Sequence, residues 1–86
     1  RLTAISEALA YPNPFSDFVT LQLDYPAETA VEVRVYDLAG RMLDTQNLRA
    51  KEALVLDMRA FPDNFYFITT TSSAVSDYFK LVKIGQ

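Results

Sequence analysis

The 86-residue sequence contains no cysteine and no histidine. The lack of cysteine excludes disulfide bonds and thiolate metal sites. The lack of both residues excludes Ser-His-Asp and Cys-His activation of a nucleophile, and it removes the commonest zinc and copper ligands. Carboxylates alone could act as a glycosidase pair across a cleft, but a small all-β chain rarely forms one. We therefore expect no catalytic residue, no metal site and no cofactor.

Glycine, proline, positive charge and long apolar runs are also scarce. With 2 Gly and 4 Pro, the chain is no low-complexity linker. The formal net charge of −3 argues against a nucleic-acid partner, which needs a basic surface. No apolar run approaches the roughly 18–20 residues that span a bilayer, and no amino-terminal signal peptide is visible. The sequence thus predicts no transmembrane segment.

What the chain has instead is a half-apolar composition with 6 Phe and 5 Tyr, enough for a small core. Apolar and polar residues alternate over short segments, as in half-buried strands, and no stretch has a convincing helical period. This pattern predicts strands over residues 18–25, 31–36, 41–45, 54–58, 65–71 and 78–84. Turns are expected at 26–28, 37–40 and 72–74, a polar loop at 46–52 and a corner at 60–64. With an edge strand around 8–11 as a seventh, we predict an all-β fold, a small seven-stranded immunoglobulin-like β-sandwich.

The run Tyr11-Pro12-Asn13-Pro14-Phe15 precedes the first clear strand. Both prolines fix φ, and a residue before proline favours extended geometry. We therefore predict a stiff, extended bracket at the start of the packed domain. Residues 1–10 are interpreted as a leader or linker from a longer cargo protein, and residues 11–86 as one domain.

Two local motifs predict specific backbone structures. Asp37 and Gly40 suit a turn that joins residues 31–45 into a hairpin, because Gly accepts φ > 0 without steric cost. Tyr66 follows the corner and is predicted to form a tyrosine corner, with its hydroxyl bonded to nearby backbone. At Asp63 and Asn64, an Asx-type turn is favoured over a calcium site.

Other side chains leave two interpretations open. Tyr36, Phe67 and Tyr78 are expected to pack in the core or corner, and an exposed sugar-stacking platform is the alternative. Lys80 and Lys83 flank Leu81-Val82 near the carboxyl end. Lysines protect exposed edge strands from pairing, and this interpretation is favoured over a recognition tag on sequence physics alone.

Four segments in this order resemble one family, the type A carboxy-terminal sorting domain of the type IX secretion system in Bacteroidetes. They are Tyr11-Pro12-Asn13-Pro14-Phe15, Val35-Tyr36-Asp37-Leu38-Ala39-Gly40-Arg41, Asn64-Phe65-Tyr66-Phe67 and Lys80-Leu81-Val82-Lys83. Asn64 stands where the family usually has Gly, and Asn best replaces Gly in left-handed backbone.

The resemblance implies a secretion signal and no enzyme. A cargo protein would cross the inner membrane by another signal, pass through the periplasm, and be recognised by the outer-membrane translocon for export to the cell surface or extracellular space. A surface sortase typically removes such a domain, here by a cut in or upstream of residues 1–10. Recognition is expected at the final strand, by strand addition near Lys80, Leu81, Val82 and Lys83. The bracket, Tyr36, Asp37, Gly40, Arg41, Asn64 and Tyr66 are expected to be structural motif residues. A carbohydrate-binding or adhesive module of a surface enzyme, or an inert spacer, is the alternative.

Overall fold

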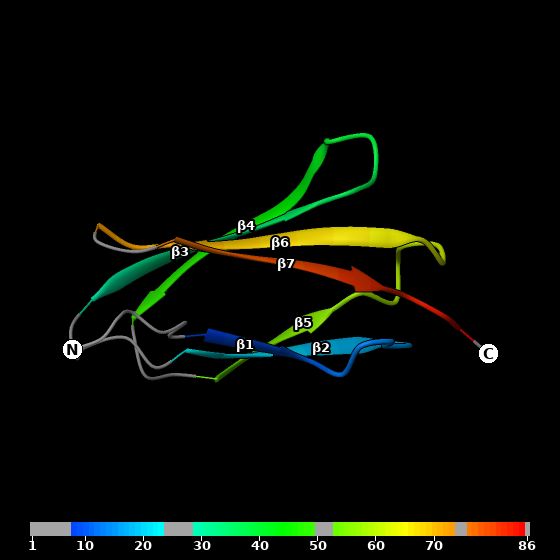
Figure 1. Ribbon diagram of the computed structural model, residues 1–86, viewed down its shortest axis with the longest axis horizontal. Coiled ribbons are helices and arrows are strands. Elements are labelled where there is room, and N and C mark those ends of the chain that lie inside the picture. Colours follow the sequence, from blue (N-terminus) through cyan, green and yellow to red (C-terminus); the bar gives the residue numbers. More distant parts are fainter. Residues whose placement is uncertain (1–7, 24–28, 50–52, 74–75, 86) are drawn as a thin grey trace.

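The computed structural model describes residues 8–23, 29–49, 53–73 and 76–85. Within these ranges the chain forms strands and loops and no helix (Figure 1). The strands are β1 (Ala8–Tyr11), β2 (Phe18–Leu23), β3 (Ala30–Tyr36), β4 (Met42–Arg49), β5 (Ala53–Asp57), β6 (Phe65–Thr71) and β7 (Ser76–Val82). The predicted all-β class is confirmed, and the expected edge strand near 8–11 is present as β1. Ala8 to Ala10 therefore lie in the packed fold, and the turn expected at 26–28 lies outside the described residues.

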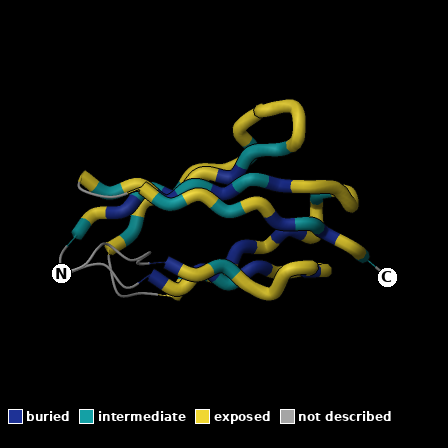
Figure 2. Tube along the Cα trace, in the orientation of Figure 1, coloured by how far each residue is buried: buried dark blue, intermediate teal, exposed yellow. Residues whose placement is uncertain are grey.

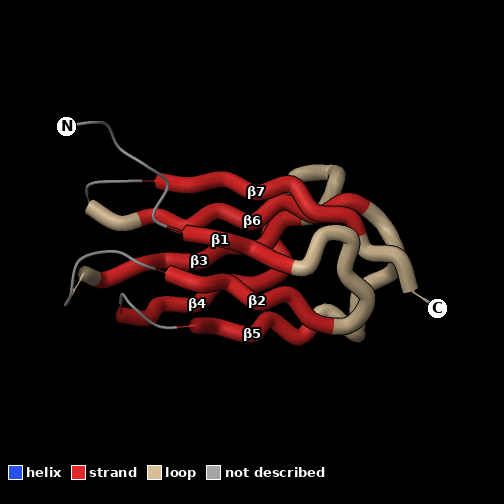
Figure 3. Tube along the Cα trace, turned by 60° about the horizontal axis from the view of Figure 1, so that its bottom comes forward, coloured by secondary structure: helices blue, strands red, loops and turns tan. Residues whose placement is uncertain are grey.

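The strands form two antiparallel sheets that face each other, as Figures 1 and 3 show. One sheet has the order β1-β2-β5 and the other β4-β3-β6-β7. This is the predicted seven-stranded sandwich. Constant-type immunoglobulin domains place their fourth strand in the sheet of the first two. Here β4 pairs with β3 instead, so the sheet that contains β1 and β2 has three strands and the sheet that contains β3 has four.

Alternation along each strand supplies the core. In β2 the buried residues Val19, Leu21 and Leu23 share a face, and in β3 Val31, Val33 and Val35 do the same. Figure 2 shows buried residues along strands of both sheets. Leu56, Ile68 and Leu81 close the core from the partner strands, because period-two geometry turns every second side chain inward.

The hairpin of β3 and β4 is confirmed at its turn and longer than expected. Gly40 has φ 88° and donates its N–H to the Asp37 carbonyl at 3.0 Å, as the turn prediction requires. The prediction of a polar loop from residue 46 was wrong for residues 46–49. These residues belong to β4, which continues beside β3 as far as Arg49. Backbone pairing holds this polar edge strand in place, with Leu48 packed against the core.

The prediction of an extended bracket at residues 11–15 was also wrong. The Tyr11-Pro12 and Asn13-Pro14 peptide bonds are cis, and the chain bends at Asn13 and Pro14. Proline makes the cis form accessible, since an X-Pro bond prefers trans by only about 0.5–1 kcal/mol. The bend carries the chain from β1 in one sheet to the edge of β7 in the other, where Phe15 forms an isolated parallel bridge with Lys83.

Core packing was the wrong expectation for Tyr36, Phe67 and Tyr78. Tyr36 pairs with Phe67 across β3 and β6, on the face that points away from the core. The Phe67 and Tyr78 rings stack with centroids 5.8 Å apart, and Tyr78 is 64% exposed. The alternation of β6 explains this placement, because its inward positions are taken by Tyr66, Ile68 and Thr70.

Candidate functional site

The edge of β7 is partly covered by the proline bracket. The Asn13 side chain donates from Nδ2 to the Lys80 carbonyl at 3.4 Å, and its Oδ1 accepts from the Val82 N–H at 3.1 Å. Phe15 then donates its N–H to the Val82 carbonyl and accepts from the Ile84 N–H. A residue in a parallel strand bonds its neighbour in this way, to the residues before and after its partner. The Asn13 amide therefore substitutes for strand backbone beside β7, next to prolines that have no N–H to donate.

Lys83 holds the end of the terminal strand from inside. Lys83 is only 7% exposed, and its Nζ donates to the carbonyls of Met58 at 2.7 Å and Phe61 at 2.6 Å. A buried ammonium needs such partners, because desolvation without them is costly. Edge protection, the favoured sequence interpretation of the lysine pair, therefore does not describe Lys83, whose charged group points inward. Lys80 is exposed, with its Nζ 4.8 Å from the Phe65 ring centroid.

The segment after β7 is also fixed to the corner between β5 and β6. The Lys83 N–H donates to the Asn64 carbonyl, and the Gly85 N–H donates to Asp63 Oδ2 at 2.9 Å. A Cβ added at Gly85 would lie 2.9 Å from Asp63 Oδ1, so this close approach favours glycine. Residues 83–85 therefore lie between the bracket on one side and the corner on the other.

The first half of the β7 edge is open. Backbone groups of Lys80 and Val82 point outward to the bracket. Those of Tyr78 and Ser76, two and four residues before Lys80, therefore point outward as well. Within the part of the chain that the structure describes, these groups of Ser76 and Tyr78 receive no bond from another segment. The bracket thus blocks pairing beside Val82 and leaves an available template beside Tyr78.

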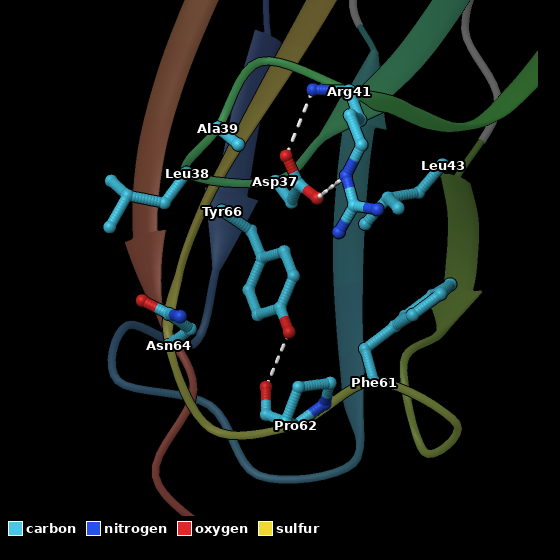
Figure 4. Close-up of a pocket in the computed structure, with 9 residues that line it drawn as sticks. All are labelled: Asp37, Leu38, Ala39, Arg41, Leu43, Phe61, Pro62, Asn64 and Tyr66. Carbon is cyan, nitrogen blue, oxygen red and sulfur yellow. Dashed lines mark hydrogen bonds and ion pairs between the residues drawn. The ribbon is translucent and has the colours of Figure 1, made fainter.

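A second candidate site lies at the same end of the sandwich as the bracket. A pocket of about 420 Å³ opens between the β3–β4 turn and the β5–β6 corner. Nine residues from segments 37–43 and 61–66 line it, and Figure 4 shows Tyr66 between the turn and the corner. Four expected motif residues, Asp37, Arg41, Asn64 and Tyr66, meet here. Tyr36 and Gly40, also expected in the motif, do not line the pocket.

The tyrosine corner predicted at Tyr66 is present. The hydroxyl donates to the Pro62 carbonyl, and the residue is 2% exposed. Phe15 and Phe61 pack against the ring, with centroids 6.3 and 6.1 Å away. Burial, followed by the nearby Asp37 and Asp63 charges, raises the pKa of Tyr66 above its ordinary value, so the hydroxyl stays protonated and able to donate at neutral pH.

Asp37 and Arg41 join the two ends of the turn. The carboxylate accepts from the Arg41 backbone N–H at 2.9 Å and from its Nε at 2.8 Å. The backbone bond is the main cause that lowers the pKa of Asp37. The Asp37 side chain is 14% exposed and that of Arg41 79% exposed. The carboxylate is therefore largely enclosed, whereas the guanidinium faces solvent.

Asp63 and Asn64 bind backbone groups with their side chains. Asn64 Oδ1 accepts from the Phe65 N–H at 2.8 Å, so this residue does bond to local backbone as expected. Asp63 instead accepts from the distant Gly85. Across the described ranges, no group of three or more acidic residues is arranged to hold a metal ion, and no helix could span a membrane.

Sequence reasoning missed three features of these sites. Lys83 follows the inward residues Phe79 and Leu81 at period two, and this alternation could have predicted its burial. The contact of Asn13 with β7 had no local signal, because the partners are 67 and 69 residues apart. The pocket requires the turn and the corner to meet, which only the sheet topology determines.

The family of secretion system C-terminal sorting domains matches residues 9–84, nearly the whole chain. No curated protein matches this chain by sequence.

The chain belongs to the family of type IX secretion C-terminal sorting domains. Its class is therefore a sorting signal, which directs an attached cargo through the type IX machinery toward the cell surface or extracellular space. The family is not an enzyme class, and the carbohydrate-binding alternative is not favoured. The resemblance inferred from the four motifs is confirmed.

Proposed function

We propose that the outer-membrane translocon recognises this domain while it is folded, at the edge of β7, after the cargo has entered the periplasm. The observation that carries this proposal is the open pair of outward backbone groups at Ser76 and Tyr78 beside a covered stretch. An exposed strand edge accepts a further strand through main-chain hydrogen bonds. The bracket confines such a strand to the first half of β7, and this gives the recognition a defined register.

The residues 80–83 would then contribute in two ways. Lys80 lies where the open edge ends, and its exposed ammonium over Phe65 can pair with an acidic group of the partner. Leu81 is buried, Val82 is bonded to Asn13, and Lys83 is bonded to Phe61 in the corner. These three residues support recognition by holding β7 rigid, because a preorganised edge loses less entropy on binding.

We further propose that a surface sortase removes the domain by a cut in or upstream of residues 1–10. The first described strand, β1, begins at Ala8, so a cut before that residue releases the cargo and leaves the seven described strands intact. Mass spectrometry of the released domain would locate its first residue. An amino terminus at residue 11 or earlier supports a cut in or upstream of residues 1–10, and one beyond residue 11 contradicts it.

The recognition proposal is tested with a reporter that carries a periplasmic signal and residues 1–86 at its carboxyl end, in a host with a type IX system. Tyr78→Pro removes one outward N–H, and proline is tolerated on the solvent side of an edge strand. Tyr78→Ala keeps the N–H and removes the same ring. We expect surface display to fall sharply for Tyr78→Pro and to persist for Tyr78→Ala.

Circular dichroism and thermal unfolding of both purified variants show whether the sandwich is intact. Full export of a folded Tyr78→Pro variant would exclude strand addition at this edge. Continued export after deletion of residues 80–86 would exclude the terminal strand altogether. That deletion also removes Leu81 and Lys83 from the packed structure, so the point variants separate recognition from folding.

A further inference from the structure

The pocket between the β3–β4 turn and the β5–β6 corner has no role in the strand addition proposed above. Its lining comes from two segments that are about twenty residues apart in sequence, and its volume of about 420 Å³ falls within the range of small-ligand pockets. Figure 1 shows the β3–β4 turn rising away from the sandwich, and the pocket lies under it. The hollow is therefore formed by the fold, because the turn does not pack down on the corner.

The walls of the pocket are mainly apolar. Leu43 and Phe61 are half-buried against the core, and Pro62 lies beside them (Figure 4). The Tyr66 ring closes the inner side, with its hydroxyl already engaged by the Pro62 carbonyl. Binding of an apolar side chain against these walls is favourable, because it removes apolar surface from water. The interior of the pocket thus suits a single aliphatic or aromatic side chain.

The mouth of the pocket carries exposed hydrogen-bond donors on Arg41. Arg41 uses its Nε for Asp37, and among the described residues its two Nη groups have no hydrogen-bond partner. Asp37 is ionised and largely enclosed, so it offsets much of the Arg41 charge, and what the mouth offers a ligand is the pair of free Nη donors. A guanidinium with free amino groups binds a carboxylate in a two-bond geometry that a lysine cannot reproduce.

We propose that this pocket is a docking site for a short protein segment in which an apolar side chain lies next to a carboxylate. The apolar side chain enters beside Leu43 and Phe61, and the carboxylate pairs with the Nη groups of Arg41. The two free Nη donors of Arg41 favour a carboxylate at the mouth over a neutral or basic group. The inference does not depend on the β7 edge, so either proposal can fail while the other stands.

The test uses the peptide acetyl-Ser-Leu-Glu-Ser-amide, whose only carboxylate is the glutamate side chain. It is titrated into the isotopically labelled 86-residue chain while backbone amide signals are followed by NMR. We expect saturable shifts confined to residues 37–43 and 61–66. Peptides with Gln in place of Glu, or Ser in place of Leu, should bind at least about tenfold more weakly, since each loses one half of the recognition.

Arg59 supplies a matched control. It is another exposed arginine, 63% exposed, and it pairs with Asp57 at 2.8 Å outside the pocket. Arg41→Gln should weaken binding at least about tenfold, Arg41→Lys should weaken it because the two-bond geometry is lost, and Arg59→Gln should leave it unchanged. Shifts that are absent, that scatter over the surface, or that survive Arg41→Gln in a folded protein would overturn the proposal. Equal binding of the Gln peptide would also overturn it.

Discussion

Lys80 and Lys83 are three residues apart in sequence and occupy opposite environments. An odd separation in a strand places two side chains on opposite faces. Lys80 therefore lies on the outer face over Phe65, and Lys83 reaches inward to two backbone carbonyls. The same residue type thus serves as a surface charge in one position and as an internal donor in the other.

Replacement of Lys83 by Met should destabilise the domain by about 2–4 kcal/mol, because one buried and one partly buried hydrogen bond from a charged donor are lost while the apolar stem is kept. Urea unfolding followed by tyrosine fluorescence measures the change. Lys80→Met is the matched control and should change stability by less than about 1 kcal/mol, since it loses only an exposed cation–π contact. Equal stability of the two variants would show that the Lys83 bonds do not hold the fold together.

The Asp57–Arg59 pair makes the stability of the fold depend on pH through a single carboxylate. Hydrogen bonds from the Arg59 side chain and then its backbone N–H lower the pKa of Asp57 from 3.8 to about 2. Because the pKa in the folded state is the lower one, the stabilisation is complete above the unfolded value of 3.8 and is lost as the pH falls through about 2. Both side chains are exposed, so the effect on stability is small.

A carboxyl-carbon NMR titration checks this value directly. Arg59→Gln should return the pKa of Asp57 toward 3.8, and Arg41→Gln, in the Asp37–Arg41 pair, should leave it in place. A titration midpoint near 3.8 in the unmodified chain would contradict the described pairing.

At the scale of elements, the register of β5 determines which of its side chains enter the core. Leu56 pairs with Val19 and is 2% exposed, whereas its neighbour Val55 is 57% exposed. Leu56→Ala should therefore cost about 2–5 kcal/mol through lost burial and a cavity. Val55→Ala should stay within about 0.5 kcal/mol. Denaturant unfolding of both variants measures the difference, and a reversed order would mean that β5 is shifted by one residue.

The bracket is the element whose role depends most on a single side chain. Asn13→Ala removes the acceptor of the Val82 N–H, so exchange of this amide with solvent should accelerate roughly 2- to 10-fold. Asn13→Asp keeps an oxygen acceptor and should preserve the protection. Hydrogen exchange by NMR compares Val82 with Lys83, whose N–H is held by the Asn64 carbonyl. Unchanged exchange at Val82 in Asn13→Ala would show that the Asn13 side chain does not protect this amide.

At the scale of the whole molecule, alternation in the sequence predicted most strands and both partners of the β3–β4 hairpin. It could not predict the second half of β4, because the residues 46–49 are mostly polar and become a strand only by pairing with β3. It also could not assign faces in β6, where Phe65-Tyr66-Phe67-Ile68 places apolar residues on both sides. The bracket was predicted as a motif, but its predicted shape was wrong. Proline restricts φ, whereas tertiary contacts decide between the cis and trans forms of the preceding peptide bond.

The sequence also predicted single residues of the candidate sites but not how they come together. The family motifs identified Asp37, Arg41, Asn64 and Tyr66 individually, and only the packing of the two sheets brings them to one pocket. In the same way, Asn13 and Lys80 both belong to predicted motifs, but their contact joins segments 67 residues apart. Local patterns therefore predicted the parts of each site, and the long-range pairing that assembles them had to come from the structure.

The central claim is that this sandwich is sufficient as an address for type IX export. The most direct measurement is protease accessibility of a periplasmic reporter fused to residues 1–86, compared between cells with and without the outer-membrane translocon. We predict that the reporter becomes accessible on the outside of intact cells only when the translocon is present. A reporter that stays in the periplasm in both strains, while the fused domain is folded, would contradict it.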